Sequence, residues 1–270
     1  MSIFDHNFLT EISLDMTGAY HMGRDLELAE NLRDDPNAPN VLRLYSWKPS
    51  CISLGYQQDE SIIDKEACKN AGVDIIKRPT GGRAVYHTEE LTYAVIMRFE
   101  PNDGIYAMHN KIAESLLELL QPLCNNELEL TDGRFPVGRT LSPSVSPETE
   151  SRYHYSPSTS ELYKPSTITN IACFASTARY EITWHGKKVV GSAQRRFGNA
   201  VLQHGSILLN DEHLRLPEFL NITDAQKSEM HSMLRRETAT LSQICGREIT
   251  PVGAIQELKF RSIKLVIPEL

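Results

Sequence analysis

The chain has 270 residues, enough for one large domain or two small ones, and its 40% hydrophobic and 23% charged residues are typical of a folded protein with a buried core. No apolar run is long enough to span a bilayer, which excludes a membrane protein, and a formal net charge of −7 disfavours general nucleic-acid binding. The five cysteines lack framework spacing and the N-terminus has no secretory pattern, so the sequence predicts a cytoplasmic protein rather than a disulfide scaffold.

The first half of the chain predicts short helices and strands in alternation. Hydrophobic periodicity and turn residues give the boundaries. They indicate a helix over 15–34, strands over 41–47 and 51–55, a helix over 64–71, a strand over 73–76, a buried strand over 92–99 and an amphipathic helix over 105–120.

The second half begins with a change of composition. Residues 136–167 are rich in Ser, Thr and Pro without sustained periodicity, which indicates a mobile surface insertion. Strands over 179–184 and 187–193 follow, joined by His185-Gly186 in a hairpin, and then a strand over 200–210 and a helix over 222–244. Hairpin strands with helices between them predict an α+β fold around a mostly antiparallel or mixed sheet.

The first chemical motif is Arg78-Pro79-Thr80-Gly81-Gly82-Arg83. Two adjacent glycines let the backbone approach a ligand closely, and the flanking arginines add charge-assisted donors. A tight turn explains the glycines equally simply. Basic residues near 77–83 and 187–196 would form one cationic site if the fold brings them together, and solvated surface charge is the alternative.

The second motif is the hairpin strand that contains Lys187 and Lys188. Side chains alternate along a strand, so one of these lysines faces inward while the other stays in solvent. An inward ammonium stabilises a thiolate or a developing oxyanion. A hairpin with two surface lysines is the alternative.

The third candidate is Cys173, which stands where the irregular segment meets the hairpin. An accessible cysteine there is a candidate nucleophile, although a single cysteine is more often a small buried residue. The other four cysteines lie within or beside apolar patterns and are assigned to packing.

Three ordered blocks resemble the biotin and lipoate protein ligase superfamily, over roughly residues 15–210. Residues 78–87 with the following Glu-Leu-Thr-Tyr resemble its signature, and residues 188–194 and 202–209 resemble its next two blocks. Trp47, Ser53-Leu54-Gly55 and Gln57 resemble the first block. Ala172-Cys173-Phe174 is similar to the cysteine-dependent octanoyltransferase branch of the lipoate-protein ligase A family, and the Asn-Asp pair usual in ATP-dependent ligases is absent.

The resemblance implies one catalytic domain over residues 1–270, with Cys173 as the nucleophile and Lys188 stabilising the thiolate or oxyanion. It implies a substrate-binding set without metal ligands, in which the two histidines orient other groups: Arg78, Gly81, Gly82, Arg83, Ala84, Val85, His87, Gly191, Ser192, Ala193, His204 and Gly205. Val85 and the glycine turn would border an acyl tunnel.

The implied reaction moves an octanoyl or lipoyl group from acyl carrier protein to a lysine of a lipoyl domain or glycine-cleavage H protein, without a cofactor. Two alternatives stay open. An ATP-dependent lipoate ligase, with ATP and Mg, would hold an acyl-adenylate and survive loss of Cys173. A carrier-domain binder without catalysis would keep the fold and form no acyl intermediate.

Overall fold

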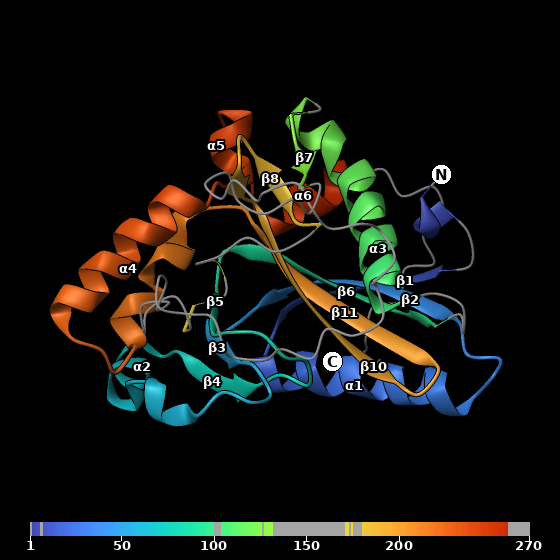
Figure 1. The fold of residues 1–270 in the computed structure, drawn as a ribbon, viewed down its shortest axis with the longest axis horizontal. Coiled ribbons are helices and arrows are strands. Elements are labelled where there is room, and N and C mark those ends of the chain that lie inside the picture. The colour runs from blue at the N-terminus through green and yellow to red at the C-terminus, as the bar shows by residue number, and fades with distance from the viewer. Residues whose placement is uncertain are drawn as a thin grey trace, which may run out of the picture.

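A five-stranded mixed sheet occupies the centre of the molecule, in the order β1-β2-β6-β11-β10 (Figure 1). The computed structural model describes residues 2–5, 8–99, 104–125, 127–131, 171–172, 174 and 180–258. The central strands are β1 (Phe8–Met16), β2 (Asn40–Trp47), β6 (Glu90–Arg98), β10 (Val190–Phe197) and β11 (Ala200–Leu208). Strands β1 and β2 are parallel and the other pairs antiparallel, so the predicted α+β class with a mixed sheet is confirmed.

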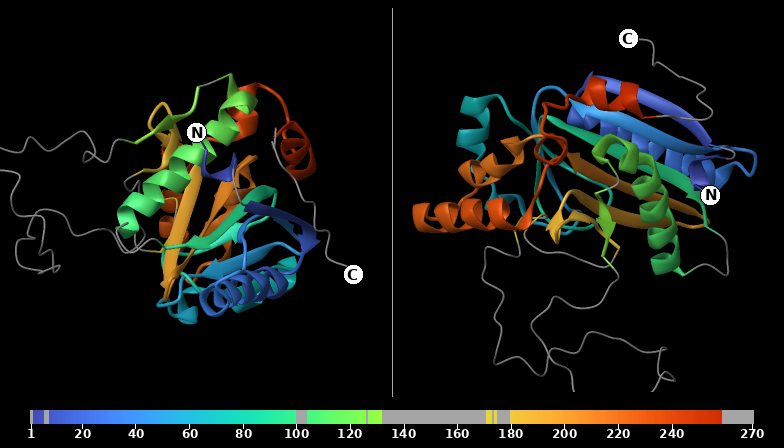
Figure 2. Two further views of the ribbon diagram at one scale, coloured as in Figure 1. Left: turned by 90° about the vertical axis from the view of Figure 1, so that its right-hand side faces the viewer. Right: turned by 90° about the horizontal axis from the view of Figure 1, so that it is seen from above.

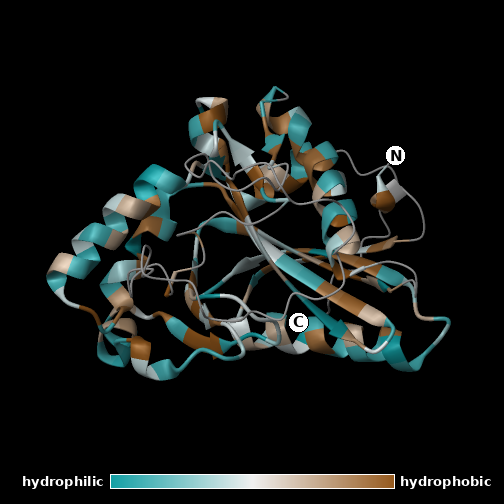
Figure 3. Cartoon of the chain, in the orientation of Figure 1, coloured by the Kyte–Doolittle hydropathy of each residue, from teal (hydrophilic) through white to brown (hydrophobic). Residues whose placement is uncertain are grey.

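Helices α1 (Gly18–Asp34) and α3 (Ile105–Leu120) cover opposite faces of this sheet (Figure 2). Alternate residues of β2 supply the two cores, as the period of two along a strand requires. Leu42 and Leu44 pack in the cluster that contains the apolar stripe of α3, whereas Tyr45 and Trp47 pack in the cluster of α1. Figure 3 shows the hydrophobic residues gathered on the strands and on the inner faces of these helices.

A smaller sheet, in the order β4-β3-β5, stands beside the central one. It consists of β3 (Cys51–Leu54), β4 (Asp74–Lys77) and β5 (Val85–His87). A third hydrophobic core joins this smaller sheet to α2 (Lys65–Ala71), to α4 (Asp224–Glu237) and to the 3-10 segment η6 (Asp211–Phe219).

The remaining described elements are short. A third sheet contains β7 (Glu129–Leu130), β8 (Ile182–Trp184) and β9 (Lys187–Lys188). The helical pieces are η1 (Ile3–Asp5), η2 (Glu60–Ile62), η3 (Gln121–Cys124), α5 (Leu241–Cys245) and α6 (Pro251–Glu257). No helix in the described part of the chain is long and apolar enough to cross a bilayer.

Several predicted elements are confirmed. The predicted helix over 105–120 is α3, and the predicted hairpin turns at His185 and Gly186, whose φ values of 46° and 76° are those of a primed turn. The predicted insertion at 136–167 lies outside the described residues.

Three predicted boundaries are wrong. The predicted helix over 15–34 starts later, because Thr17 caps α1 and Met16 ends β1. The predicted helix over 222–244 is two helices, because Thr240 starts α5 with a capping box. The predicted strand over 187–193 divides at Val189, so β9 and β10 belong to different sheets.

We predict opposite effects for two glycine substitutions. A Cβ on Gly205 of β11 would lie 2.3 Å from the Gly191 oxygen, and backbone cannot yield easily, so Gly205→Ala should lower the free energy of unfolding by about 1–3 kcal/mol. Gly23, exposed on α1 with nothing within 4 Å, is the control, and Gly23→Ala should raise it by about 0.5–1 kcal/mol. Urea unfolding measures both. Parent-like stability of Gly205→Ala would contradict this close packing.

Candidate active site

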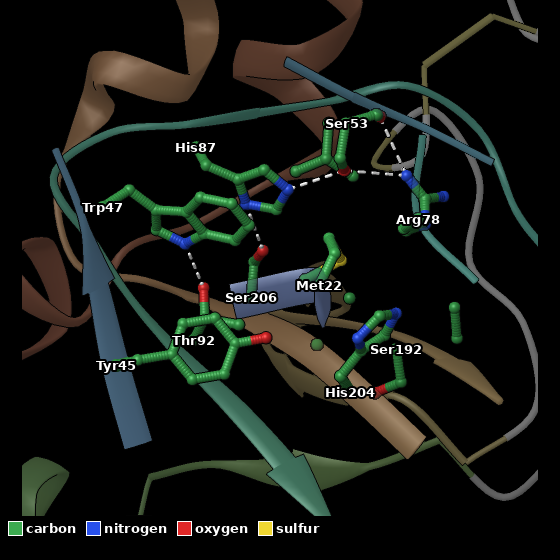
Figure 4. Close-up of a pocket in the computed structure, with 14 residues that line it drawn as sticks. Met22, Tyr45, Trp47, Ser53, Arg78, His87, Thr92, Ser192, His204 and Ser206 are labelled. Atoms are coloured by element: carbon green, nitrogen blue, oxygen red, sulfur yellow. Dashed lines mark hydrogen bonds between the residues drawn. The ribbon is translucent and has the colours of Figure 1, made fainter. Parts of the chain in front are cut away.

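A pocket lies between the central sheet and the smaller sheet, and side chains from both sheets and from α1 line it (Figure 4). Eight predicted substrate-binding residues line it: Arg78, Val85, His87, Gly191, Ser192, Ala193, His204 and Gly205. Six lining residues are missing from the predicted site: Met22, Tyr45, Trp47, Ser53, Thr92 and Ser206. Four predicted residues are not among the lining residues: Gly81, Gly82, Arg83 and Ala84.

Arg78 holds the Gly-Gly segment against strand β3. Its guanidinium donates to the backbone oxygens of Gly81 (3.0 and 3.2 Å) and Arg83 (2.6 Å). It also donates to the backbone and side-chain oxygens of Ser53, both at 2.9 Å. These five hydrogen bonds match the five N–H donors of arginine. Arg78 therefore supports the pocket wall, and direct substrate binding by this side chain stays a prediction.

The glycines of this segment permit a close approach that other residues would prevent. Gly82 has a φ of +94°, in the range that favours glycine. A Cβ on Gly55, after β3, would lie 2.0 Å from the Gly82 oxygen. The tight turn is therefore real, and it forms part of the pocket support.

His87 of β5 is fixed within a buried chain of hydrogen bonds. Ser53 Oγ accepts from Arg78 and shares a hydrogen bond of 2.7 Å with His87 Nε2. His87 Nδ1 then donates to Glu90 Oε1 at 2.6 Å, an acceptor that it shares with Thr92. The ring also stacks on Trp47, with centroids 4.0 Å apart (Figure 4). His87 is thus an oriented part of the wall.

His204 of β11 joins the pocket to the Gly-Gly segment and to α1. Its Nδ1 donates to Asp25 at 2.9 Å, and Nε2 accepts from Thr80 Oγ1 at 2.7 Å. Burial lowers the pKa of His204, although the Asp25 carboxylate opposes this shift. We find no group of three or more His, Cys, Asp or Glu residues arranged for a metal ion within the described residues.

Lys188 of β9 is the inward lysine of its pair. It is 2% exposed, whereas Lys187 is half-buried. Its ammonium forms an ion pair with the buried carboxylate of Glu181, and Nζ lies 5.3 Å from the centroid of the Phe174 ring. A Cβ on Gly191 would lie 2.9 Å from that ring, so glycine is needed there for this packing.

Cys173 itself lies outside the described residues, but residues on both sides of it are described. Ala172 forms a parallel bridge with Ala84, whose N–H donates to the Ile171 oxygen at 2.8 Å. Phe174 contacts the Lys188 ammonium on the other side. The structure therefore places Ala84, the residues on either side of Cys173 and Lys188 in one region, and the catalytic role of Cys173 stays a prediction.

Comparison with known proteins assigns the chain to a family. The family model described as the lipoyl protein ligase A/B catalytic domain matches residues 17–260. The chain belongs to this family. Octanoyltransferase LipM of Anoxybacillus flavithermus is 32% identical to it over 91% of this chain and 81% of the relative. Octanoyltransferase LipM of Moorella thermoacetica is 35% identical to it over 81% of this chain and 71% of the relative.

Solved structures agree on the fold of this lipoyl ligase A/B family. A bi-partite lipoate protein ligase of Thermoplasma acidophilum superposes with a TM-score of 0.61 at 16% identity, over 97% of this chain and 88% of that one. At this identity the likeness shows the fold alone. The predicted superfamily resemblance and the ligase-like catalytic fold are confirmed.

The sequence analysis missed two buried carboxylates, Asp25 and Glu181, that contact residues of the candidate site. Asp25 interrupts the apolar stripe of α1 formed by Met22, Ala29 and Leu32, and a polar residue on such a stripe is a signal for a buried partner. Glu181 precedes β8, in which Thr183 lies opposite Lys188. Glu181 lies two residues before Thr183, and side chains two residues apart along a strand point to the same face. This alternation in the predicted hairpin is the signal that could have identified Glu181 as a partner of Lys188.

We predict that the buried His21 makes the protein less stable in mild acid. Burial lowers the pKa of His21, on α1, to about 4. The unfolded chain binds a proton near pH 6.5 while the folded ring stays neutral, so stability present above that pH is lost as pH falls toward 4. This group alone should cost about 2 kcal/mol between pH 7 and pH 5.

Urea unfolding of the parent and of His21→Gln at both pH values measures this contribution. The variant should lose less stability than the parent on acidification. Equal losses in the two proteins would mean that His21 titrates alike in the folded and unfolded states.

Proposed function

We propose that this protein is an octanoyltransferase that moves an octanoyl group from acyl carrier protein to a lysine of a lipoyl domain or glycine-cleavage H protein. The intermediate is a thioester on Cys173. The acyltransferase class agrees with the names of the relatives over most of the chain. The observation that carries the mechanism is the buried Lys188 ammonium beside Phe174, the residue that follows the proposed nucleophile.

The polar groups of the pocket suit an unsubstituted acyl chain. The polar side chains that line it all hydrogen-bond within the protein: Tyr45, Trp47, Ser53, Arg78, His87, Thr92, Ser192, His204 and Ser206. An octanoyl chain needs no hydrogen-bond partner. A ligand with a polar ring would compete with these existing bonds or leave its own groups unpaired.

The reaction proceeds in two acyl transfers. The Cys173 thiolate attacks the carbonyl carbon of the donor thioester, the bond to the carrier sulfur breaks, and that sulfur leaves and takes up a proton. The neutral ε-amine of the acceptor lysine then attacks the Cys173 thioester. The carbon–sulfur bond breaks, the amide forms, the amine loses its proton, and the thiolate is regenerated.

Lys188 has an electrostatic task in both transfers. A fixed ammonium in a water-poor site stabilises the thiolate and the oxyanion that develops on the carbonyl oxygen. Because a thioester is already an activated acyl group, conversion to an amide is downhill and needs no ATP. A cytoplasmic location would keep the thiol reduced.

The first prediction concerns the donor and the nucleophile. Mixing the protein with octanoyl acyl carrier protein, without nucleotide, should give an acyl adduct in the intact mass spectrum. Cys173→Ala should abolish the adduct and slow turnover by roughly three orders of magnitude or more, because it removes the covalent acceptor. Cys68→Ala, which alters a buried packing cysteine, is the control and should keep the adduct.

Other results would change the proposed function or the proposed nucleophile. Activity that appears only with ATP and free octanoate or lipoate would make the protein a ligase. An adduct that persists in Cys173→Ala would place the nucleophile elsewhere, and binding of carrier domains without any acyl transfer would support a non-catalytic binder.

The second prediction separates the two lysines of the hairpin. Lys188→Ala should shift alkylation of the thiol to higher pH and slow acyl capture, because a charge that favours the thiolate is lost. Lys188→Arg should restore only part of the rate, since a planar guanidinium replaces a compact ammonium. Lys187→Ala, next along the strand but half-buried, should behave like the parent. The pH profile of alkylation tests all three, and an unchanged profile in Lys188→Ala would remove that lysine from thiol activation.

A further inference from the structure

The Lys188 ammonium and the Glu181 carboxylate form an ion pair that is almost entirely removed from solvent. The side chains are 3% and 5% exposed. A buried ammonium is stable only with a counterion, and the contact of Lys188 with the Phe174 ring does not supply a full negative charge. Glu181 is therefore a buried counterion of the Lys188 ammonium.

Backbone hydrogen bonds hold both members of the pair in place. The Glu181 N–H donates to Thr131 Oγ1 at 2.9 Å, and the Thr131 N–H donates to the Glu181 oxygen at 3.0 Å. On the other side, the Lys188 oxygen accepts from the Ala239 N–H at 3.0 Å. These bonds fix the backbone positions from which the two side chains meet in their ion pair.

The surroundings of Glu181 extend to the pocket wall. Burial raises the pKa of Tyr93 to about 12, and the Glu181 carboxylate adds to this shift, which keeps the phenol neutral. The Tyr93 hydroxyl and Ser192 Oγ are 2.8 Å apart, and Ser192 lines the pocket beside Gly191. One carboxylate thus acts on the lysine and on a hydrogen bond of the wall.

We propose that Glu181 is a positioning residue, which holds the Lys188 ammonium in place through their buried ion pair. This inference rests on the proposed function. Activated nucleophiles commonly have a neighbour that assists them and a third group that orients this neighbour. Cys173, Lys188 and Glu181 complete such a set.

The test compares acyl capture in single-turnover experiments with octanoyl acyl carrier protein. Glu181→Gln keeps the size of the side chain and removes its charge, and it should slow acyl capture by roughly 100-fold, the low end of what a positioned proton-transfer group contributes. KM should change little. Glu181→Asp keeps the charge at a shorter reach and should fall between Glu181→Gln and the parent.

Glu127→Gln is the matched control. Glu127 is exposed and accepts a hydrogen bond from Trp184 of β8 at 2.9 Å, so this variant alters a carboxylate that contacts the hairpin without touching the buried pair. It should retain the acyl-capture rate of the parent. Thermal unfolding of each variant shows whether it is folded. If Glu181→Gln does not fold, Glu181→Asp alone tests the inference. For this variant too we expect slower acyl capture at an unchanged KM.

A double-mutant cycle decides whether Glu181 acts through Lys188. Adding Glu181→Gln to Lys188→Ala should slow acyl capture little further, because the group to be positioned is already gone. The same large factor in both backgrounds, or parent-like rates in both Glu181 variants, would overturn the inference. The proposed function fails in a different way, when the parent forms no adduct or when Cys173→Ala keeps it.

Discussion

A fully buried carboxylate, Asp25, joins helix α1 to the central sheet and to the pocket. It accepts hydrogen bonds from Arg43, Tyr45 and His204. Burial alone would raise its pKa, but Arg43 and His204 outweigh burial and hold the pKa of Asp25 below its usual range. Removal of one partner from such a buried set costs about 3–5 kcal/mol, because the other charge stays behind unpaired. The position of the pocket wall therefore depends on this contact.

The hydrogen bonds that fix the wall also determine what the pocket accepts. Asp25 orients His204, His204 accepts from Thr80, and Thr80 begins the Gly-Gly segment that Arg78 holds against β3. On the opposite side, Glu90 organises His87, Thr92 and Ser206. Polar side chains that hydrogen-bond to one another can line a pocket for an apolar chain, because they need no hydrogen-bond partner on the ligand. Rigidity and tolerance of an acyl group thus have one cause.

Local sequence patterns predicted much of this arrangement. They could not predict contacts between segments that are far apart in the sequence. Helix α3 and the Lys188 hairpin follow from periodicity and turn residues, and the lysine that faces inward was limited to one of two. Strand β1 escaped prediction. Its neighbour β2 begins 24 residues after β1 ends, and parallel pairing over such a separation has no local signal. Met22 escaped prediction for the same reason, since only tertiary packing places α1 beside the pocket.

Charge placement separates the pocket wall from the proposed reacting end of the site. Burial lowers the pKa of His204, and the Arg78 guanidinium of the wall donates to oxygens of Ser53, Gly81 and Arg83. The Lys188 ammonium lies instead against Phe174, next to the proposed nucleophile. A charge placed there interacts weakly with a bound acyl chain and strongly with a developing oxyanion. Interactions that strengthen only in the transition state raise the rate rather than the affinity, so this separation favours turnover over tight binding.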